Sequence, residues 1–144
     1  MTDMKIFIVD DDIFCLALYQ QLLRNLGYSD VTPFNSGEEC LEHLAEQPDL
    51  VFLDYNMEGM NGIEVLKRIK AANPATMVYI ISGQENAAVG EEAIQHGALD
   101  YIVKSSLSPD KVATVMDKAK SLYKPKPTAT KKSFFAKVKS GLGI

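Results

Sequence analysis

The sequence has few cysteines and histidines, and its first apolar run is short. Its two cysteines, Cys15 and Cys40, form neither a CxxC motif nor a metal-spaced pair, so we predict small buried thiols in a reducing environment. The two histidines, His43 and His96, lie in helix-like stretches at no useful spacing, and we interpret both as structural. The first apolar run, residues 6–9, is followed by three aspartates and is too short for a signal peptide or a membrane span. These absences favour a cytoplasmic protein without a membrane span.

Acidic side chains are absent from the last part of the chain. The 144 residues carry 19 acids and 15 bases, for a net charge of −4. All 19 acids and nine of the bases fall in residues 1–123, which therefore carry −10, whereas residues 124–144 hold six lysines and carry +6. We expect one folded domain over residues 1–123 and a separate basic tail over residues 124–144. An acidic domain is not attracted to the negatively charged backbone of nucleic acid. We therefore expect that residues 1–123 do not bind nucleic acid directly.

The basic tail divides into two parts. Residues 124–132 lack apolar side chains beyond Ala129 and are typical of an extended linker. Phe134 and Val138 then lie four positions apart among lysines, which indicates a possible short basic amphipathic helix. Two interpretations stay open: a mobile tail, or a peptide that docks on a partner or on the acidic body.

Apolar runs alternate with helical stripes along the body of the chain. We predict strands at residues 6–9, 31–34, 50–53, 77–81 and 99–103. We predict helices at residues 13–26, from the Ser36 capping box to Pro48, at 63–73, 86–96 and 108–123. In the first helix, Phe14, Leu18 and Leu22 fall on one apolar stripe. Such alternation predicts an α/β fold with a parallel sheet covered on both faces, and it leaves the strand order open.

Four of the predicted strands end in a polar side chain. Asp10 and Asp11 follow the first strand, Asp54 the third, Ser82 the fourth and Lys104 the fifth. Because parallel strands share one carboxyl edge, we expect these side chains to converge. Three carboxylates so close together repel one another unless a divalent cation such as Mg²⁺ is bound. The lysine and the hydroxyl indicate a phosphoryl group, and Asp54 is placed to attack its phosphorus atom.

Each of these residues also has a simpler interpretation when it is taken alone. Asp12 has the position of a helix N-cap, and Ser82 before Gly83 is typical of a turn. Lys104 is typical of a solvated surface charge, and Tyr101 of a half-buried strand residue. The order acid, acid, hydroxyl, lysine at the ends of four strands is what indicates a common site.

Residues 4 to about 123 resemble the response-regulator receiver domain of two-component signalling, in its stand-alone, chemotaxis-regulator-like form. The matching stretches are residues 8–12, 51–57, 80–83 and 100–104. The resemblance implies a flavodoxin-like, doubly wound fold with a five-stranded parallel sheet in the order 2-1-3-4-5.

The resemblance also implies roles for individual residues and partners. It makes Asp54 the phosphoacceptor, and it places Mg²⁺, for which Mn²⁺ can substitute, on Asp10, Asp11, Asp54 and the backbone carbonyl of Asn56. It gives Ser82 and Lys104 contacts to the phosphoryl group, and Tyr101 a rotamer change coupled to Ser82. The phosphodonor would be a sensor histidine kinase or a histidine phosphotransfer protein. The signal would pass to an unidentified protein through the face formed by the fourth helix, the fifth strand and the fifth helix, which is also a possible homodimer surface.

Three residues depart from the family pattern near the site. Glu58 stands where the family usually has proline, so we expect a more mobile loop after Asp54. Asn61 replaces a common aspartate, a mild change. Ser105 stands where the family usually has a proline that often follows a cis bond. A cis bond without proline costs about 3 kcal/mol, so we expect a trans peptide bond between Lys104 and Ser105.

Two other functions are compatible with the same residues. One is a Mg²⁺-dependent phosphohydrolase or phosphotransferase with an aspartate nucleophile. Such enzymes usually carry a second acid two residues after the nucleophile, where this chain has Asn56. The other is a receiver-like binding module that is never phosphorylated. We favour a signalling switch that assists its own phosphorylation and dephosphorylation over an enzyme with a separate substrate.

Overall fold

Short apolar runs form the strands, and capped amphipathic segments form the helices between them. The computed structural model describes residues 4–83 and 86–125. Their elements are β1 (Ile6–Val9), α1 (Ile13–Asn25), β2 (Val31–Phe34), α2 (Gly37–Glu42), η1 (Leu44–Glu46), β3 (Leu50–Asp54), α3 (Gly62–Ala72), β4 (Met77–Ser82), α4 (Ala87–Gln95), β5 (Asp100–Val103), η2 (Lys104–Ser106) and α5 (Pro109–Leu122). The η elements are single 3₁₀ turns.

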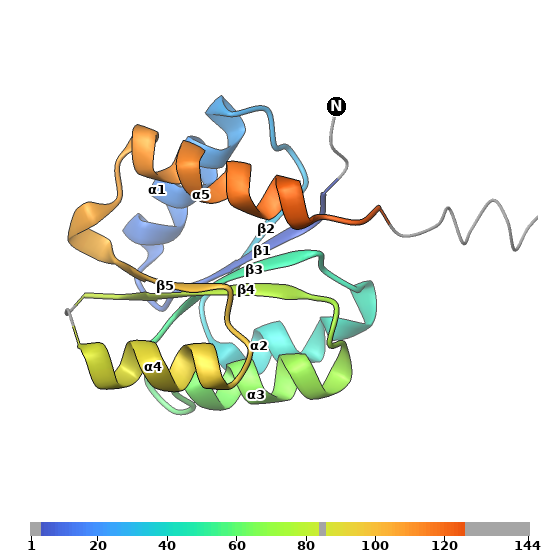
Figure 1. Cartoon of the computed structure of the whole chain (residues 1–144), viewed down its shortest axis with the longest axis vertical. Helices are drawn as coiled ribbons and strands as arrows, with labels where there is room; N and C mark the ends of the chain where they lie inside the picture. Colours follow the sequence, from blue (N-terminus) through green and yellow to red (C-terminus); the bar gives the residue numbers. More distant parts are fainter. Residues whose placement is uncertain (1–3, 84–85, 126–144) are drawn as a thin grey trace, which may run out of the picture.

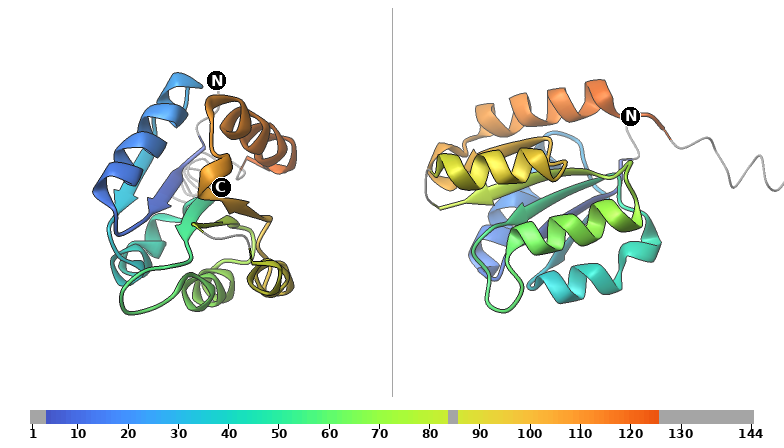
Figure 2. Two further views of the ribbon diagram at one scale, coloured as in Figure 1. Left: turned by 90° about the vertical axis from the view of Figure 1, so that its left-hand side faces the viewer. Right: turned by 60° about the horizontal axis from the view of Figure 1, so that its bottom comes forward.

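The five strands form one parallel sheet in the order β2-β1-β3-β4-β5. Helices α1 and α5 cover one face, and α2, α3 and α4 cover the other (Figure 1, Figure 2). Each face has its own apolar core, and β3 between them is buried along its whole length. The predicted fold class and strand order are confirmed. This order places the carboxyl ends of β1 and β3 side by side at the centre of one edge of the sheet.

Side-chain caps begin the helices where the sequence predicts them. The Asp12 carboxylate accepts a hydrogen bond from Phe14 N, and Ser36 Oγ accepts one from Glu39 N. Each cap satisfies a backbone N–H that has no partner inside its helix. The predicted N-cap role of Asp12 is confirmed, and this role orients Asp12 toward α1.

The predicted stripe of α1 is not its buried face. Phe14 is 80% exposed and Leu18 is 53% exposed, whereas Leu16, Tyr19 and Leu23 face the core. Apolar residues form two alternative stripes along this helix, and periodicity alone does not decide which stripe packs on the sheet. As a result, α1 carries large apolar side chains on its outer surface.

The second helix is shorter than predicted. It ends at Glu42, and a 3₁₀ turn from Leu44 to Glu46 replaces its last turn. Gln47 then takes a left-handed conformation with φ 57°, which turns the chain into β3. The predicted linker and short helix of the tail lie outside the described residues. Among the described residues, no helix has both the length and the apolar character that crossing a membrane requires.

Candidate functional site

The sheet register brings the predicted site residues to one edge. Val9 pairs with Leu53, so Asp10 lies level with Asp54, the last residue of β3. Ser82 ends β4 beside Val103. Asp10 is 0% exposed, and Asp54 and Ser82 are 2% exposed. Buried polar side chains are uncommon unless a partner compensates them, and three at one edge indicate a functional site.

The carboxylates of Asp10, Asp11 and Asp54 form a cluster. One oxygen of each lies within 4.8 Å of an oxygen of the other two. Asp10 Oδ2 and Asp54 Oδ1 are buried, and among the described residues Lys104 is the group that compensates them. Several anionic oxygens, two of them buried, are the donor set that Mg²⁺ prefers. The residues present therefore fit a divalent cation.

Lys104 enters the same cluster from the end of β5. Its Nζ lies 2.9 Å from Asp10 Oδ2 and 3.5 Å from Asp54 Oδ1, and its side chain is 27% exposed. The peptide bond to Ser105 is trans, as expected, and the chain passes into η2 at this point. A serine in place of the usual proline does not remove the lysine from the site.

Burial and charge set the ionisation of the central pair. Burial raises the pKa of Asp54 to about 6, and the charge of Asp10 adds to this, while Lys104 opposes it. Burial alone would lower the pKa of Lys104, but its hydrogen bond to Asp10 and the charge of Asp54 outweigh this and raise that pKa. At neutral pH the pair is therefore a carboxylate beside an ammonium, the state needed for attack on a phosphoryl group.

Backbone contacts hold the loops that carry the acids. Asp10 Oδ1 accepts a hydrogen bond from Asp12 N at 2.9 Å, and Asp11 Oδ2 accepts one from Glu58 N at 3.4 Å. The second contact ties the loop after β3 to the cluster. At Gly62, a Cβ atom would lie 2.6 Å from the backbone oxygen of Asp54. A side chain larger than hydrogen is therefore excluded where α3 passes Asp54.

The two remaining predicted residues lie outside the cluster, Asn56 beyond the same edge and Tyr101 near the start of β5. Asn56 is exposed two positions beyond β3. Tyr101 is half-buried on β5, and its ring contacts α4 at Gly90, where a Cβ would lie 3.5 Å from the ring. The metal role of the Asn56 carbonyl and the rotamer change of Tyr101 stay predictions.

Sequence reasoning missed two neighbours of the site. The Cys15 thiol lies 3.9 Å from Lys104 Nζ, and burial, together with the charge of Asp10, raises its pKa. It is thus a protonated neighbour of the lysine at neutral pH. The backbone N–H of Glu58 is the other. The position of Cys15 in the first turn of α1, directly after the acidic loop, is a signal that could have identified it.

Comparisons with known proteins agree with this geometry. Residues 6–116 match the family model of the response regulator receiver domain. The chain belongs to the response regulator receiver family. It is therefore a signalling module of the class used in two-component systems, in which phosphorylation controls the signal.

Individual relatives show how far the similarity extends. The chain is 42% identical over 118 residues to the transcriptional regulatory protein ZraR of Escherichia coli, a match that covers 81% of this chain and 26% of that protein. It is 32% identical to the chemotaxis protein CheY of Thermotoga maritima, over 79% of this chain and 95% of that one. This chain thus spans about a quarter of ZraR and nearly all of CheY.

A solved relative extends the comparison to structure. The CheX–CheY–BeF₃–Mg complex from Borrelia burgdorferi matches with a TM-score of 0.73 and 28% identity, over 79% of this chain and 87% of that one. The receiver fold therefore covers the described body of this chain.

Proposed function

We propose that this receiver accepts a phosphoryl group on Asp54 and signals by protein–protein contact. The observation that carries the proposal is the cluster itself. Asp54 ends the central strand, its oxygens share a site with those of Asp10 and Asp11, and Lys104 lies 3.5 Å away. A nucleophile, an acidic cation site and a cation for the phosphoryl oxygens are the parts that phosphoryl transfer to a carboxylate requires.

In the proposed step, a carboxylate oxygen of Asp54 attacks the phosphorus atom of a phosphohistidine. A new O–P bond forms and the P–N bond breaks, and the leaving imidazole nitrogen keeps the electron pair and takes a proton from solvent. Lys104 offsets the negative charge on the phosphoryl oxygens, and Ser82 donates a hydrogen bond to one of them. Water later attacks the phosphorus atom, the O–P bond to Asp54 breaks, and inorganic phosphate leaves while the carboxylate is restored.

Asp10, Asp11, Asp54 and the backbone carbonyl of Asn56 would hold Mg²⁺, for which Mn²⁺ can substitute. When bound, the cation offsets the charge that builds up on the transferred group. Asp10 Oδ2 contacts Lys104 at 2.9 Å, so cation binding at Asp10 requires this ion pair to loosen. Lys104 is then available to Asp54 and the phosphoryl group.

The outer face of α1 is the proposed docking surface for the phosphodonor protein. Ile13 is 65% exposed, Phe14 80% and Leu18 53%. These residues follow the acidic loop directly, so a partner that covers them reaches the edge that carries Asp54. Large exposed apolar side chains beside a reactive group fit a transient protein interface.

A phosphodonor experiment tests the proposed function. Purified protein is incubated with Mg²⁺ and acetyl phosphate or beryllofluoride, and modification is followed by intact mass and by NMR chemical shifts at Asp54. We expect wild type to respond and Asp54→Asn not to respond. Asp12→Asn is the matched control, because Asp12 caps α1 and an asparagine keeps that cap. A wild type that gives no response, or an Asp54→Asn variant that responds equally, contradicts the proposal.

The same assay separates the two alternatives. Repeated turnover of small phosphate esters would favour a Mg²⁺-dependent phosphohydrolase or phosphotransferase. Partner binding that is unchanged by beryllofluoride would favour a module that is never phosphorylated.

Docking of the histidine kinase or phosphotransfer protein on α1 is tested with Phe14→Ala. We expect this variant to slow phosphoryl transfer from the protein donor but not from acetyl phosphate.

A further inference from the structure

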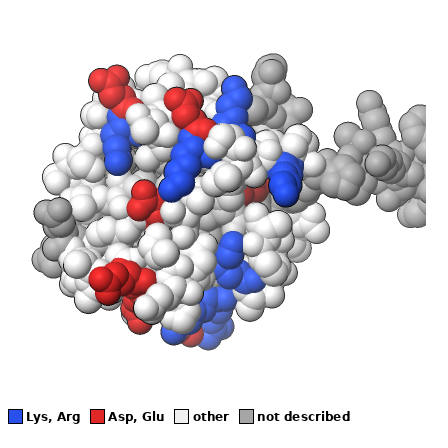
Figure 3. All heavy atoms as spheres, in the orientation of Figure 1, with Lys and Arg blue, Asp and Glu red and all other residues white. Residues whose placement is uncertain are grey.

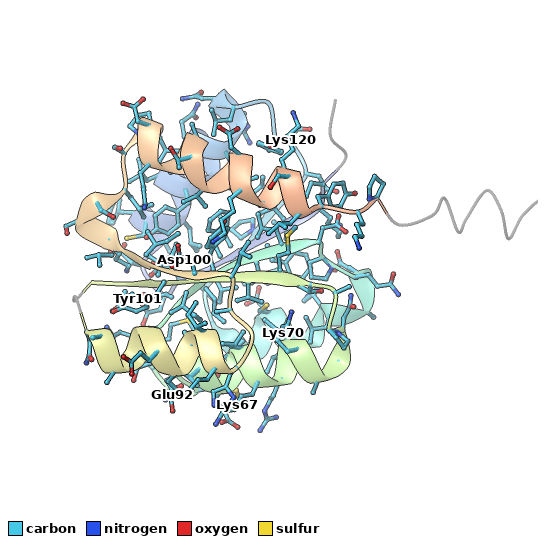
Figure 4. All side chains as sticks on the ribbon, viewed as in Figure 1. Lys67, Lys70, Glu92, Asp100, Tyr101 and Lys120 are labelled. Atoms are coloured by element: carbon cyan, nitrogen blue, oxygen red, sulfur yellow. The ribbon has the colours of Figure 1, made fainter. Side chains whose placement is uncertain are left out.

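A groove between α4 and β5 has the chemistry of a peptide-binding site. Its volume is about 520 Å³, and it is lined by Ala87, Gly90, Glu91, Ile94, Gln95, Asp100 and Tyr101. Ile94, which is 50% exposed, and the half-buried Tyr101 supply apolar surface, and Glu91 and Asp100 supply two carboxylates. The lining contains no lysine or arginine. In Figure 4, Tyr101 lies on the side of β5 that faces α4, and Asp100 lies on the opposite side of this edge strand.

The charge on this face is uneven. Figure 3 views the face and shows acidic side chains over α4 and at β5, both acidic and basic side chains over α5, and basic side chains along the lower edge. Asp100 Oδ1 accepts a hydrogen bond from Tyr101 N at 2.8 Å, which fixes the carboxylate at the rim. A ligand for this groove needs apolar side chains for its floor and positive charges for its rim.

The chain itself contains a segment of that chemistry. Residues 133–139 read Ser-Phe-Phe-Ala-Lys-Val-Lys, with two aromatic side chains, one valine and two lysines. No acid occurs between residues 124 and 144, so the segment carries no charge that the groove would repel. We propose that residues 133–139 bind the groove between α4 and β5 of the same chain.

The linker is long enough for this contact. The described chain leaves α5 on the side of the molecule where α4 ends and β5 begins (Figure 1). Eight residues lie between Pro125 and Phe134, and an extended chain from one to the other reaches up to about 30 Å. Helix α4 has nine residues and is about 14 Å long. A tether of this length gives an effective concentration on the order of millimolar, so weak contacts suffice.

The apolar face of α1 fits this segment less well. The neighbouring carboxylates serve other parts of the molecule, because Asp11 belongs to the cluster at the sheet edge and Asp12 caps the helix. In the groove, Glu91 and Asp100 are exposed at the rim and outside that cluster. The contact does not depend on phosphorylation, so it is testable in the unphosphorylated protein and stands apart from the function of Asp54.

The first test compares amide NMR spectra of the full chain with and without the aromatic pair. We expect Phe134→Ser/Phe135→Ser to shift the amides of groove residues such as Gly90, Ile94 and Tyr101, and to leave the rest of the body unchanged. Thr128→Ser in the linker is the control. Unchanged groove amides, or changes that fall on α1 instead, overturn the proposal.

Charge reversal tests the orientation. The spectra of the wild-type tail and of the Phe134→Ser/Phe135→Ser tail are compared again in a body that carries Glu91→Lys/Asp100→Lys. This change should abolish the difference between the two spectra, whereas Glu42→Lys on α2 should preserve it. Adding Lys137→Glu/Lys139→Glu to the groove variant should restore the difference. Shifts that depend on protein concentration would show that the tail binds a second copy, which contradicts a contact within one chain. The tail variants keep the test valid even if a groove variant folds poorly.

Discussion

Replacing Asp54 with asparagine should stabilise the protein when no divalent cation is bound. The free carboxyl has a pKa of 3.8, and burial and the charge of Asp10 raise it to about 6 in the folded protein. The folded state therefore holds its proton more tightly than the unfolded state, and stability is lost as the pH rises from 3.8 to about 6. At about 1.4 kcal/mol per pKa unit, the buried charge costs about 3 kcal/mol at pH 7.5.

The stabilisation by Asp54→Asn should consequently depend on pH. We expect almost no difference from wild type near pH 4 and a gain of about 2 to 3 kcal/mol above pH 7, or roughly 8 °C in Tm. Urea titrations with EDTA at several pH values measure it. Mg²⁺ at one hundred times its Kd should stabilise wild type by about 2.7 kcal/mol, and Asp54→Asn much less. A variant that is less stable than wild type at pH 7.5 with EDTA, or a gain that is independent of pH, would refute the reasoning.

Three further substitutions test the supports of the site. Lys104→Met removes the cation that offsets the two buried carboxylates, and it should lower the free energy of unfolding by about 2 kcal/mol in EDTA, a loss that Mg²⁺ reduces; equal urea midpoints would contradict this. Gly62→Ala should destabilise by at least about 2 kcal/mol, because its Cβ would lie 2.6 Å from backbone. Gly83→Ala is its control in the same titration, because a Cβ at Gly83 has no atom within 4 Å. Its free energy of unfolding should fall much less than that of Gly62→Ala. Tyr79→Phe removes the buried hydrogen bond to the Val115 carbonyl, 2.9 Å long, and should cost about 1 kcal/mol; an unchanged thermal midpoint would show that this bond contributes nothing.

The sequence predicts the strand ends better than it predicts the helix faces. The buried strands are short apolar runs with a single interpretation, so the position of Asp54 at the end of β3 follows from Val51, Phe52 and Leu53 directly. Helix α1 has apolar residues all around, and only the packing on the sheet selects Leu16 rather than Phe14 for the core. The last residue of a helix is similarly hard to predict, because a 3₁₀ turn can replace the last helical turn, as it does after α2.

Within the site, the sequence predicts which residues converge but not how they pair. The strand order that makes β1 and β3 neighbours came from family resemblance and not from periodicity. The contact of Lys104 with Asp10, at 2.9 Å, is shorter than its contact with Asp54, at 3.5 Å, and no spacing in the sequence encodes that preference. It arises from side-chain geometry at the end of β5, where η2 sets the direction of the lysine.

The preference of Lys104 for Asp10 has a functional consequence. A cation bound at Asp10 would neutralise the nearer partner of Lys104, and a phosphoryl group on Asp54 would add negative charge at the farther one. Both changes would draw the lysine from Asp10 toward Asp54. Lys104 lies at the junction of β5 and η2, so a shift of its backbone would also shift the strand that carries Tyr101. The α4–β5 groove includes Tyr101. A ligand in that groove and a phosphoryl group on Asp54, both as proposed above, would therefore act on opposite ends of one four-residue strand. If binding at either end changes the position of β5, the two events must alter each other's affinity by the same factor.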